Sequence, residues 1–265
     1  MVVQHNLTAM NSNRMLGLTN ATQAKSTEKL SSGYKINRAA DDAAGLAISE
    51  KMRRQVRGLT QAAANAQDGV SMVQTAEGAL NEVHDMLQRM NELAVKAVNG
   101  TNQTDDQGYI QSEINQLASE ITRTANDTKF NKKDLLNGSG TVSLQVGAEA
   151  GNTITINLSD MKAATIGVGS LNISTSGAIT SIDNAIQSVS KFRSDLGAVQ
   201  NRLEHTINNL KNVAENTQAA ESAIRDTDMA TEMVKYSNNN ILAQAGQAML
   251  AQANQSNQGV LSLLG

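Results

Sequence analysis

Three histidines and two close pairs of aspartates are the side chains of this chain that could take part in catalysis. The histidines are His5, His84 and His205, which lie far apart in the sequence and outside any His-Glu-x-x-His motif. Zinc sites are built from histidines and cysteines at short spacings, and the chain has no cysteine. We therefore interpret the histidines as solvated or interfacial side chains and expect no metal site.

The paired carboxylates have two possible roles. Asp41 with Asp42, and Asp226 with Asp228, could act as general acid and base. Aspartates at helix junctions more often accept hydrogen bonds from the free N–H groups of a first helical turn. A Gly-Val-Gly segment at 167–169 lacks the third glycine and the βα unit of a phosphate-binding loop. We predict helix caps or ion-pair partners, no cofactor and no enzyme activity.

Composition narrows the class of protein further. The net charge of -3 gives no basic face for nucleic acid, and no stretch approaches the roughly 20 apolar residues that span a bilayer. We expect neither nucleic-acid binding nor membrane insertion. Residues 1–6 do not begin a cleavable secretion signal, so any export is expected to use another route. Aromatic residues make up only 2% and proline is absent, which favours long helices around a thin aliphatic core.

Apolar residues recur at every seventh position in two long segments, as in a coiled coil. The earlier segment predicts a helix from Ala44 to Val98, and the later one keeps its pattern for about six heptads. The earlier seam is Leu59, Ala66, Val73, Leu80, Leu87 and Ala94. The later seam is Ile182, Val189, Leu196, Leu203, Leu210, Thr217 and Ile224, with Ala185, Phe192, Val199, Thr206, Val213, Ala220 and Thr227 beside it.

A shorter helix and one hairpin are expected between these segments. Ile110, Ile114 and Ile121 share one helical face, and Asp105 or Asp106 is the expected cap. Apolar residues alternate in 142–146 and again in 153–158, on either side of a turn. The predicted fold class is mainly α, an elongated antiparallel coiled-coil or helix-bundle rod with one small β-hairpin region.

Both ends of the chain are apolar and almost uncharged. No charged side chain occurs from Ser237 to Gly265, and between Met1 and Gln23 only Arg14 and His5 can carry charge. Ordering costs about 1–2 kcal/mol per residue, so we expect the ends to be disordered in the monomer and to order with partners. The expected assembly residues are Leu7, Met10, Leu18, Ile241, Leu242, Met249, Leu250, Val260, Leu261 and Leu264.

Several segments carry a family resemblance. Residues 30–53 read LSSGYKINRAADDAAGLAISEKMR and resemble a signature near the N-terminus of bacterial flagellins. QDG at 67–69, TAEGAL at 75–80 and LGAVQNRL at 196–203 are similar to flagellin motifs as well, as are LAQANQ at 250–255 and VLSLL at 260–264. The resemblance covers essentially the whole chain.

The resemblance implies a structural subunit of the flagellar filament that is exported and polymerises with itself for motility. Its domains would be an inner D0 domain from residues 1–42 and 227–265, and a D1 rod from residues 43–178 and 179–226. The expected location is the extracellular bacterial flagellum. The expected partners are other copies in a helical homopolymer, an export chaperone at the C-terminal helix, and the hook-junction and cap proteins.

The segment LQRMNEL at 87–93 resembles a flagellin motif that Toll-like receptor 5 reads in many members of the family. The receptor-binding residues implied by this resemblance are Gln88, Arg89, Leu93, Ile110 and Glu113. Asn91 replaces the second arginine of the motif, which is expected to weaken recognition without abolishing it.

Two other functions would also fit parts of the sequence. A hook-filament junction protein of the same superfamily shares the terminal helices but usually diverges in the middle motifs that match here. An unrelated coiled-coil scaffold would explain the heptads, but it gives no reason for apolar, uncharged segments at both ends. The flagellin interpretation accounts for all of these features.

Overall fold

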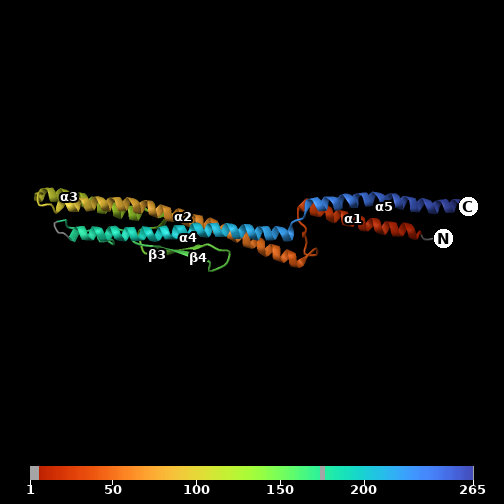
Figure 1. Ribbon diagram of the computed structural model, residues 1–265, viewed down its shortest axis with the longest axis horizontal. Helices are drawn as coiled ribbons and strands as arrows, with labels where there is room; N and C mark the ends of the chain where they lie inside the picture. The colour runs from red at the N-terminus through yellow and green to blue at the C-terminus, as the bar shows by residue number, and fades with distance from the viewer. Residues whose placement is uncertain (1–5, 174–176, 265) are drawn as a thin grey trace. The chain divides into compact units, whose positions relative to one another are not determined.

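The computed structural model describes residues 6–173 and 177–264, with residues 257–264 described by their backbone alone. The chain forms two compact units. We call residues 55–215 the central unit, and residues 1–54 together with 216–265 the terminal unit. Within these described residues, five helices and four short strands follow one another, so the predicted mainly helical class is confirmed (Figure 1).

Three helices build the central unit. They are the parts of α2 (Ala43–Ala97) and α4 (Gly177–Arg225) that lie in this unit, and all of α3 (Thr104–Asp127). Their apolar faces form one continuous core, in which the side chains of Leu80, Leu87 and Ile121 are fully buried. Every predicted seam residue of α2 is buried. The 3.5-residue period therefore identified the buried face of this helix correctly.

The predicted seam of α4 is confirmed only for part of its length. Its main line is buried at every position from Ile182 to Leu210, and Thr217 and Ile224 are partly buried. In the line beside it, Val213 and Ala220 are exposed. A small separate cluster of Leu59, Ala62 and Leu210 marks the point where the main core ends. Beyond this cluster the heptad pattern continues in the sequence, but its positions are only partly buried or exposed.

The two aspartate pairs form hydrogen bonds to the backbone or to neighbouring side chains at helix junctions. The Asp42 carboxylate accepts a hydrogen bond from the N–H of Gly45 in the first turn of α2. Asp228 accepts from the N–H groups of Ala230 and Thr231 at the start of α5 (Met229–Leu264). Asp41 accepts from backbone N–H groups of the preceding loop, and Asp226 accepts from Ser222. The capping interpretation is therefore confirmed for Asp42 and Asp228.

The predicted cap of α3 was wrong. The N-cap residue is Gln103, and α3 begins at Thr104. Asp106 instead lies inside the first turn, where its carboxylate accepts a hydrogen bond of 3.2 Å from the N–H of Gln103. A carboxylate at this third helical position can accept a hydrogen bond from the N–H of the cap residue. The acidic residue therefore marked the start of the helix correctly, but it is not the cap residue itself.

Two hairpins are present where one was expected. The predicted one pairs β3 (Gly140–Gln145) with β4 (Thr153–Leu158) in antiparallel register, with Val142 opposite Ile156. It packs closely on α2, as shown by the overlap that a methyl group added at Gly69 would make with the side chain of Leu144. The second pairs β1 (Lys129–Phe130) with β2 (Lys133–Asp134) through Asn131 and Lys132, whose φ angles are 48° and 65°. Such a two-residue turn needs positive φ at both positions.

The terminal unit contains the first and the last helix of the chain, together with the start of α2 and the end of α4. α1 (Leu7–Ser32) and α5 run antiparallel, so the two termini lie at the same end (Figure 1). Asn6 caps α1 by accepting a hydrogen bond from the N–H of Ala9, and its side-chain amide donates to the carbonyl oxygen of Ala253. Among their described residues, only Ser26 of α1 and Glu232, Ala243 and Ala253 of α5 are buried.

The core of the central unit yields a stability prediction. Leu80→Ala removes a fully buried side chain from the joint core of α2, α3 and α4 and is expected to lower the free energy of unfolding by about 2–5 kcal/mol. Val95→Ala on the same helix changes an exposed side chain and should cost less than about 0.5 kcal/mol. Urea unfolding followed by far-ultraviolet circular dichroism measures both. Equal losses in the two variants would contradict the assignment of the core.

Candidate assembly and recognition surfaces

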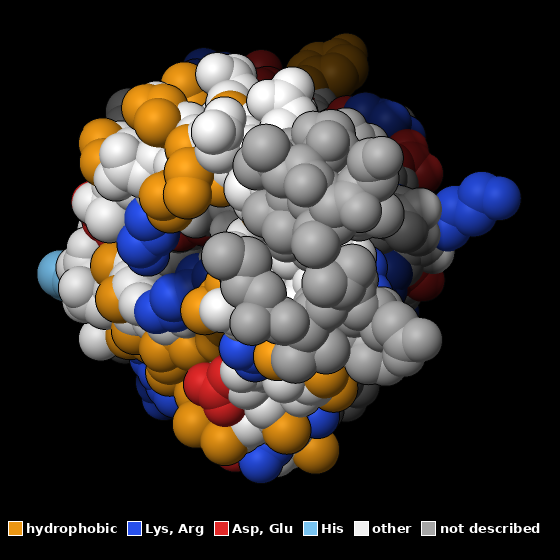
Figure 2. All heavy atoms as spheres, turned by 90° about the vertical axis from the view of Figure 1, so that its right-hand side faces the viewer, with side chains coloured by type: hydrophobic (Ala, Val, Ile, Leu, Met, Phe, Trp, Pro, Cys, Tyr) orange, Lys and Arg blue, Asp and Glu red, His pale blue; other side chains and the backbone are white. Residues whose placement is uncertain are grey.

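Large apolar side chains are exposed along both helices of the terminal unit. Leu7, Met10 and Leu18 on α1, and Ile241, Leu242 and Met249 on α5, each expose more than half of their surface. In a space-filling view toward the end where the termini lie, hydrophobic side chains are visible at the surface in several places (Figure 2). Soluble monomers rarely leave so much apolar surface uncovered, which indicates an interaction surface.

The packing between α1 and α5 explains why these side chains stay outside. Several of the residues at the contact between the two helices are small. Ala243 and Ala253 are buried there, and a Cβ atom built on Gly246 would lie 3.3 Å from Cδ1 of Leu16. Small residues let the two helices approach closely, and the large residues are then directed to the outside of the pair.

Most of the predicted assembly residues can be placed. Leu250 is partly buried, and the six named above are exposed. Val260, Leu261 and Leu264 belong to the helical backbone of α5, but their side chains lie outside the described part of the structure. Four exposed apolar residues of α1 and α5 were left out of the predicted set: Met15, Met229, Met233 and Val234. Val234 is followed by Lys235 and precedes the uncharged stretch that drew attention to the C-terminus.

A second surface combines charged side chains from α2 and α3. Nε of Arg89 donates to Oε1 of Glu113 at 3.1 Å, and Nη1 of Arg89 donates to Oε2 of Glu92 at 3.0 Å. Hydrogen bonds to Glu92 and Glu113 raise the pKa of Arg89, so this guanidinium stays charged. Gln88 lies beside it, exposed and hydrogen-bonded to His84. Arg89, Glu113 and Gln88 are therefore accessible side chains on one surface.

Two of the five predicted recognition residues lie in the core. Leu93 is 3% exposed and Ile110 is 7% exposed, and both belong to the apolar core of the central unit. Their side chains pack between helices and offer almost no surface to a partner. The motif at 87–93 lies on a helix, so some of its side chains face the core and others face solvent. Only the exposed side chains can make the first contact with a partner.

The signature at 30–53 forms a polar joint within the terminal unit. The ring of Tyr34 lies under two guanidinium groups, with Cζ of Arg225 at 4.6 Å and Cζ of Arg53 at 5.8 Å from its centroid. Nη1 of Arg225 donates to Oε1 of Glu50 at 2.6 Å, and Arg53 also forms an ion pair with Glu221. Cation–π and ionic contacts thus connect the start of α2 with the end of α4.

Backbone hydrogen bonds reinforce this joint. The N–H of Lys35 donates to the carbonyl oxygen of Arg225 at 2.7 Å, and the N–H of Thr227 donates to that of Gly33 at 3.0 Å. Gly33 ends α1 with a φ of 75°, a conformation that glycine adopts without strain. Sequence reasoning recognised this segment as a signature but did not foresee its partners, which are nearly 200 residues away in the chain.

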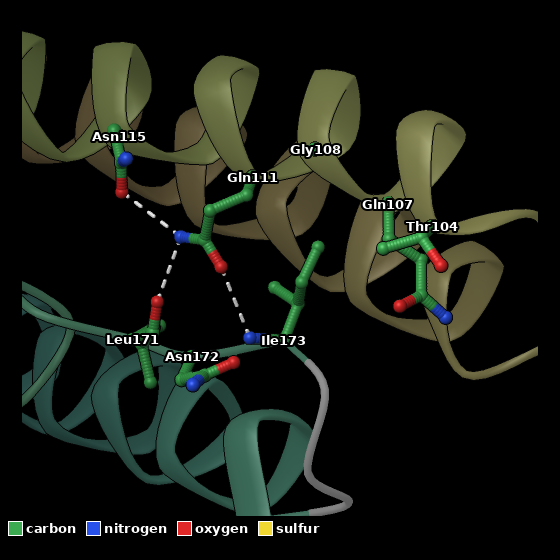
Figure 3. Close-up of a pocket in the computed structure, with 8 residues that line it drawn as sticks. All are labelled: Thr104, Gln107, Gly108, Gln111, Asn115, Leu171, Asn172 and Ile173. Carbon is green, nitrogen blue, oxygen red and sulfur yellow. Dashed lines mark hydrogen bonds between the residues drawn. The ribbon is translucent and has the colours of Figure 1, made fainter.

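A polar groove on α3 is occupied partly by the chain itself. The side chain of Gln111 donates to the carbonyl oxygen of Leu171 at 2.8 Å and accepts from the N–H of Ile173 at 3.1 Å (Figure 3). It also donates to Asn115 at 2.9 Å. Gln111 therefore clamps the segment before α4 onto α3, which is a structural role that the sequence pattern did not reveal.

The residues considered for catalysis form no site in the described residues. No group of three or more His, Cys, Asp or Glu side chains is arranged to hold a metal ion within residues 6–173 and 177–256. His5 lies outside the described residues, and the aspartates make the hydrogen bonds given above. Within the part of the chain that the structure describes, no helix combines the length and apolarity needed to cross a membrane.

Comparison with known proteins places these surfaces in a family context. The model of the bacterial flagellin N-terminal helical region matches residues 3–141, and that of the bacterial flagellin C-terminal helical region matches residues 179–264. A flagellin of Halalkalibacterium halodurans is 54% identical, and the flagellar filament 31.3 kDa core protein of Treponema maltophilum is 48% identical, each alignment covering 100% of both chains.

A solved structure gives a similar result. The crystal structure of Bacillus cereus flagellin matches with a TM-score of 0.50 and 32% sequence identity, and the match covers 56% of this chain and 88% of that one. The flagellin of Bacillus subtilis, at 48% identity over the whole of both chains, is a further relative.

Proposed function

Because this chain belongs to the bacterial flagellins, we propose that the exposed apolar residues of α1 and α5 are the surfaces through which it polymerises. As a flagellin it is a structural subunit of the flagellar filament. Family membership excludes an unrelated scaffold, and the whole-length relatives named above carry flagellin or filament-core names rather than those of hook-junction proteins. The observation that carries the proposal is the large side chains left uncovered on both terminal helices.

The energetics favour coupling between order and assembly. Burying one large aliphatic side chain contributes about 1.5–3 kcal/mol, whereas ordering each residue costs about 1–2 kcal/mol. In α1 and α5 of a single chain, few large side chains are buried, so the balance is poor. Neighbouring copies would cover the outer faces of both helices, and the gain from burial would then offset the cost of order.

The proposed domain organisation follows the helix breaks. The inner D0 domain would comprise residues 1–42 and 227–265, and the D1 rod would comprise 43–178 and 179–226. α1 is separated from α2 by residues 33–42, and α4 from α5 by residues 226–228. The compact units divide inside α2, after Arg54, and inside α4, after Glu215, because the Tyr34 joint includes the ends of both helices.

The proposal extends to the partners that precede assembly. We propose that the chain is secreted to the extracellular flagellum and that an export chaperone covers the apolar side of α5 before that step. Met233, Val234 and Ile241 are exposed on this helix and would suit a hydrophobic groove. Contacts with the hook-junction and cap proteins would use the same terminal helices at the two ends of the filament.

Seeded polymerisation tests the assembly surface. Ile241→Ser combined with Leu242→Ser removes two exposed apolar side chains and should raise the critical concentration at least about tenfold, since about 1.4 kcal/mol corresponds to a factor of ten. Gln244→Ser removes an exposed polar side chain from the same helix and should change it less than about twofold. Sedimentation and negative-stain images of purified chain with short filament seeds measure both.

The proposal predicts a clear difference between these variants. A double variant that elongates seeds as readily as Gln244→Ser would refute the assembly surface. Thermal unfolding of the central unit should be unchanged in both variants, which separates a loss of assembly from a loss of folding.

We further propose that the surface of Arg89, Glu113 and Gln88 binds Toll-like receptor 5. The support is the resemblance of residues 87–93 to the receptor-binding motif and the exposure of these three side chains on adjoining helices. Leu93 and Ile110 would support this surface from beneath. An arginine on a rigid helix is a common hot spot of protein interfaces.

A receptor reporter assay tests this recognition surface. Arg89→Ala should reduce the potency of the soluble chain at least about tenfold, as expected for a hot-spot residue. Arg123→Ala is the matched control, because Arg123 is also an exposed arginine with two carboxylate partners, Glu120 and Asp127. Asn91→Arg restores the family motif and should increase potency. Equal potency of the two alanine variants would contradict the proposed surface.

A further inference from the structure

Methionine is concentrated on the exposed faces of α1 and α5. Half of the large apolar side chains that these two helices expose, among their described residues, carry a thioether. Within residues 55–173 and 177–215 of the central unit, the exposed large apolar side chains are Val95, Val98, Tyr109 and Val213, and none of these contains sulfur. We call the exposed methionines of the terminal helices the outer methionines; they are Met10, Met15, Met229, Met233 and Met249.

The methionines of the central unit are covered by their surroundings. Met90 is fully buried, Met72 and Met161 expose 5% and 6% of their surface, and Met86 is partly buried. An oxidant dissolved in water reaches an exposed sulfur faster than a sulfur packed in a core. Mild oxidation should therefore modify the outer methionines first and spare the core of the central unit.

Two outer methionines share a surface with a residue of the proposed assembly face. Met15 of α1 and Met249 of α5 line one groove between the two helices, and Leu242 lines the same groove. Met15 is 52% exposed and Met249 is 63% exposed, so solvent reaches both side chains in the free chain. A chemical change at their sulfurs would alter the surface that a neighbouring copy is proposed to cover.

The relevant chemistry is oxidation of a thioether by a peroxide. Methionine carries the only sulfur of the chain, because the chain has no cysteine. A sulfur lone pair attacks one oxygen of hydrogen peroxide, so that an S–O bond forms and the O–O bond breaks. The departing hydroxide takes the proton of the transferred oxygen and leaves as water. Sulfur loses two electrons and the peroxide gains them, and sulfoxide reductases can reverse the change.

We propose that oxidation of the outer methionines to sulfoxides prevents the free chain from polymerising, and that reduction restores polymerisation. The inference rests on the proposed assembly role of α1 and α5. In the free chain each sulfoxide stays hydrated at an exposed position, so the fold of the chain is unchanged. In a filament the same sulfoxide would face apolar side chains of a neighbouring copy, and a polar group buried without a hydrogen-bond donor opposes association.

Seeded polymerisation of peroxide-treated chain tests this inference. The purified chain is treated with hydrogen peroxide, the sulfoxides are assigned by peptide mass spectrometry, and the critical concentration is measured with untreated filament seeds after the peroxide is removed. Conversion of the outer methionines should raise the critical concentration at least about tenfold. Methionine sulfoxide reductases A and B should return it to within about twofold of the untreated value, which irreversible damage would not allow.

Leucine replacements separate the outer methionines from other targets of peroxide. Leucine keeps an apolar side chain of similar size but has no sulfur, so the variant should polymerise like the parent before treatment and stay within about twofold after it. As a control, Met52→Leu with Met86→Leu removes two partly buried methionines of α2 and should leave the chain as sensitive as the parent. The test variant is Met10→Leu, Met15→Leu, Met229→Leu, Met233→Leu and Met249→Leu.

The possible results distinguish this inference from the assembly proposal. A parent chain oxidised at all outer methionines that elongates seeds at the untreated critical concentration would overturn the oxidation inference and leave the assembly proposal intact. Equal sensitivity of the leucine variant and the parent would place the target of peroxide elsewhere and would overturn it as well. The reductase experiment uses the parent alone, so it decides the question even if the leucine replacements themselves impair assembly. The assembly proposal fails separately, if untreated Ile241→Ser with Leu242→Ser polymerises like Gln244→Ser.

Discussion

The terminal unit depends on a constraint of size. α1 and α5 meet largely through small residues such as Ala243, Gly246 and Ala253, so they can approach closely but bury few of their own large side chains against each other. Close approach gives hydrogen bonds such as that from Asn6 to Ala253, but little apolar burial. The outer apolar faces therefore remain available to other copies of the chain. To be stable alone, the terminal unit would have to bury these apolar side chains within itself. To polymerise, it must leave them exposed for neighbouring copies.

The central unit, in contrast, buries its large side chains within a single chain. Its three helices place leucine, isoleucine, valine and methionine on facing sides and bury many of them, and glycine at position 69 lets the β3–β4 hairpin lie against α2. This core forms without a partner chain. The Tyr34 joint of the terminal unit uses a different kind of contact: arginines and glutamates replace apolar side chains, and two backbone hydrogen bonds connect distant parts of the sequence.

Much of this could be predicted from sequence wherever the determinant is periodic. The α2 seam and the β3–β4 hairpin follow from spacing, because burial repeats with the period of the element. The α4 seam was overextended past Leu210, since a heptad pattern does not say what lies opposite it. The joint of Tyr34 with Arg225 was not predicted, because it depends on which distant residues meet. The burial of Leu93 and Ile110 was missed because a motif resemblance does not separate buried from exposed positions.

Hydrogen exchange tests the central claim most directly, namely that the terminal helices gain their stability from neighbouring copies. Mass spectrometry would follow peptides from α1 and α5, with peptides from the central part of α2 as an internal reference. The account predicts rapid exchange of α1 and α5 amides in the free chain and protection of at least about a hundredfold in the filament, with little change in the reference. Strong protection of α1 and α5 in the free chain, unchanged on polymerisation, would contradict it.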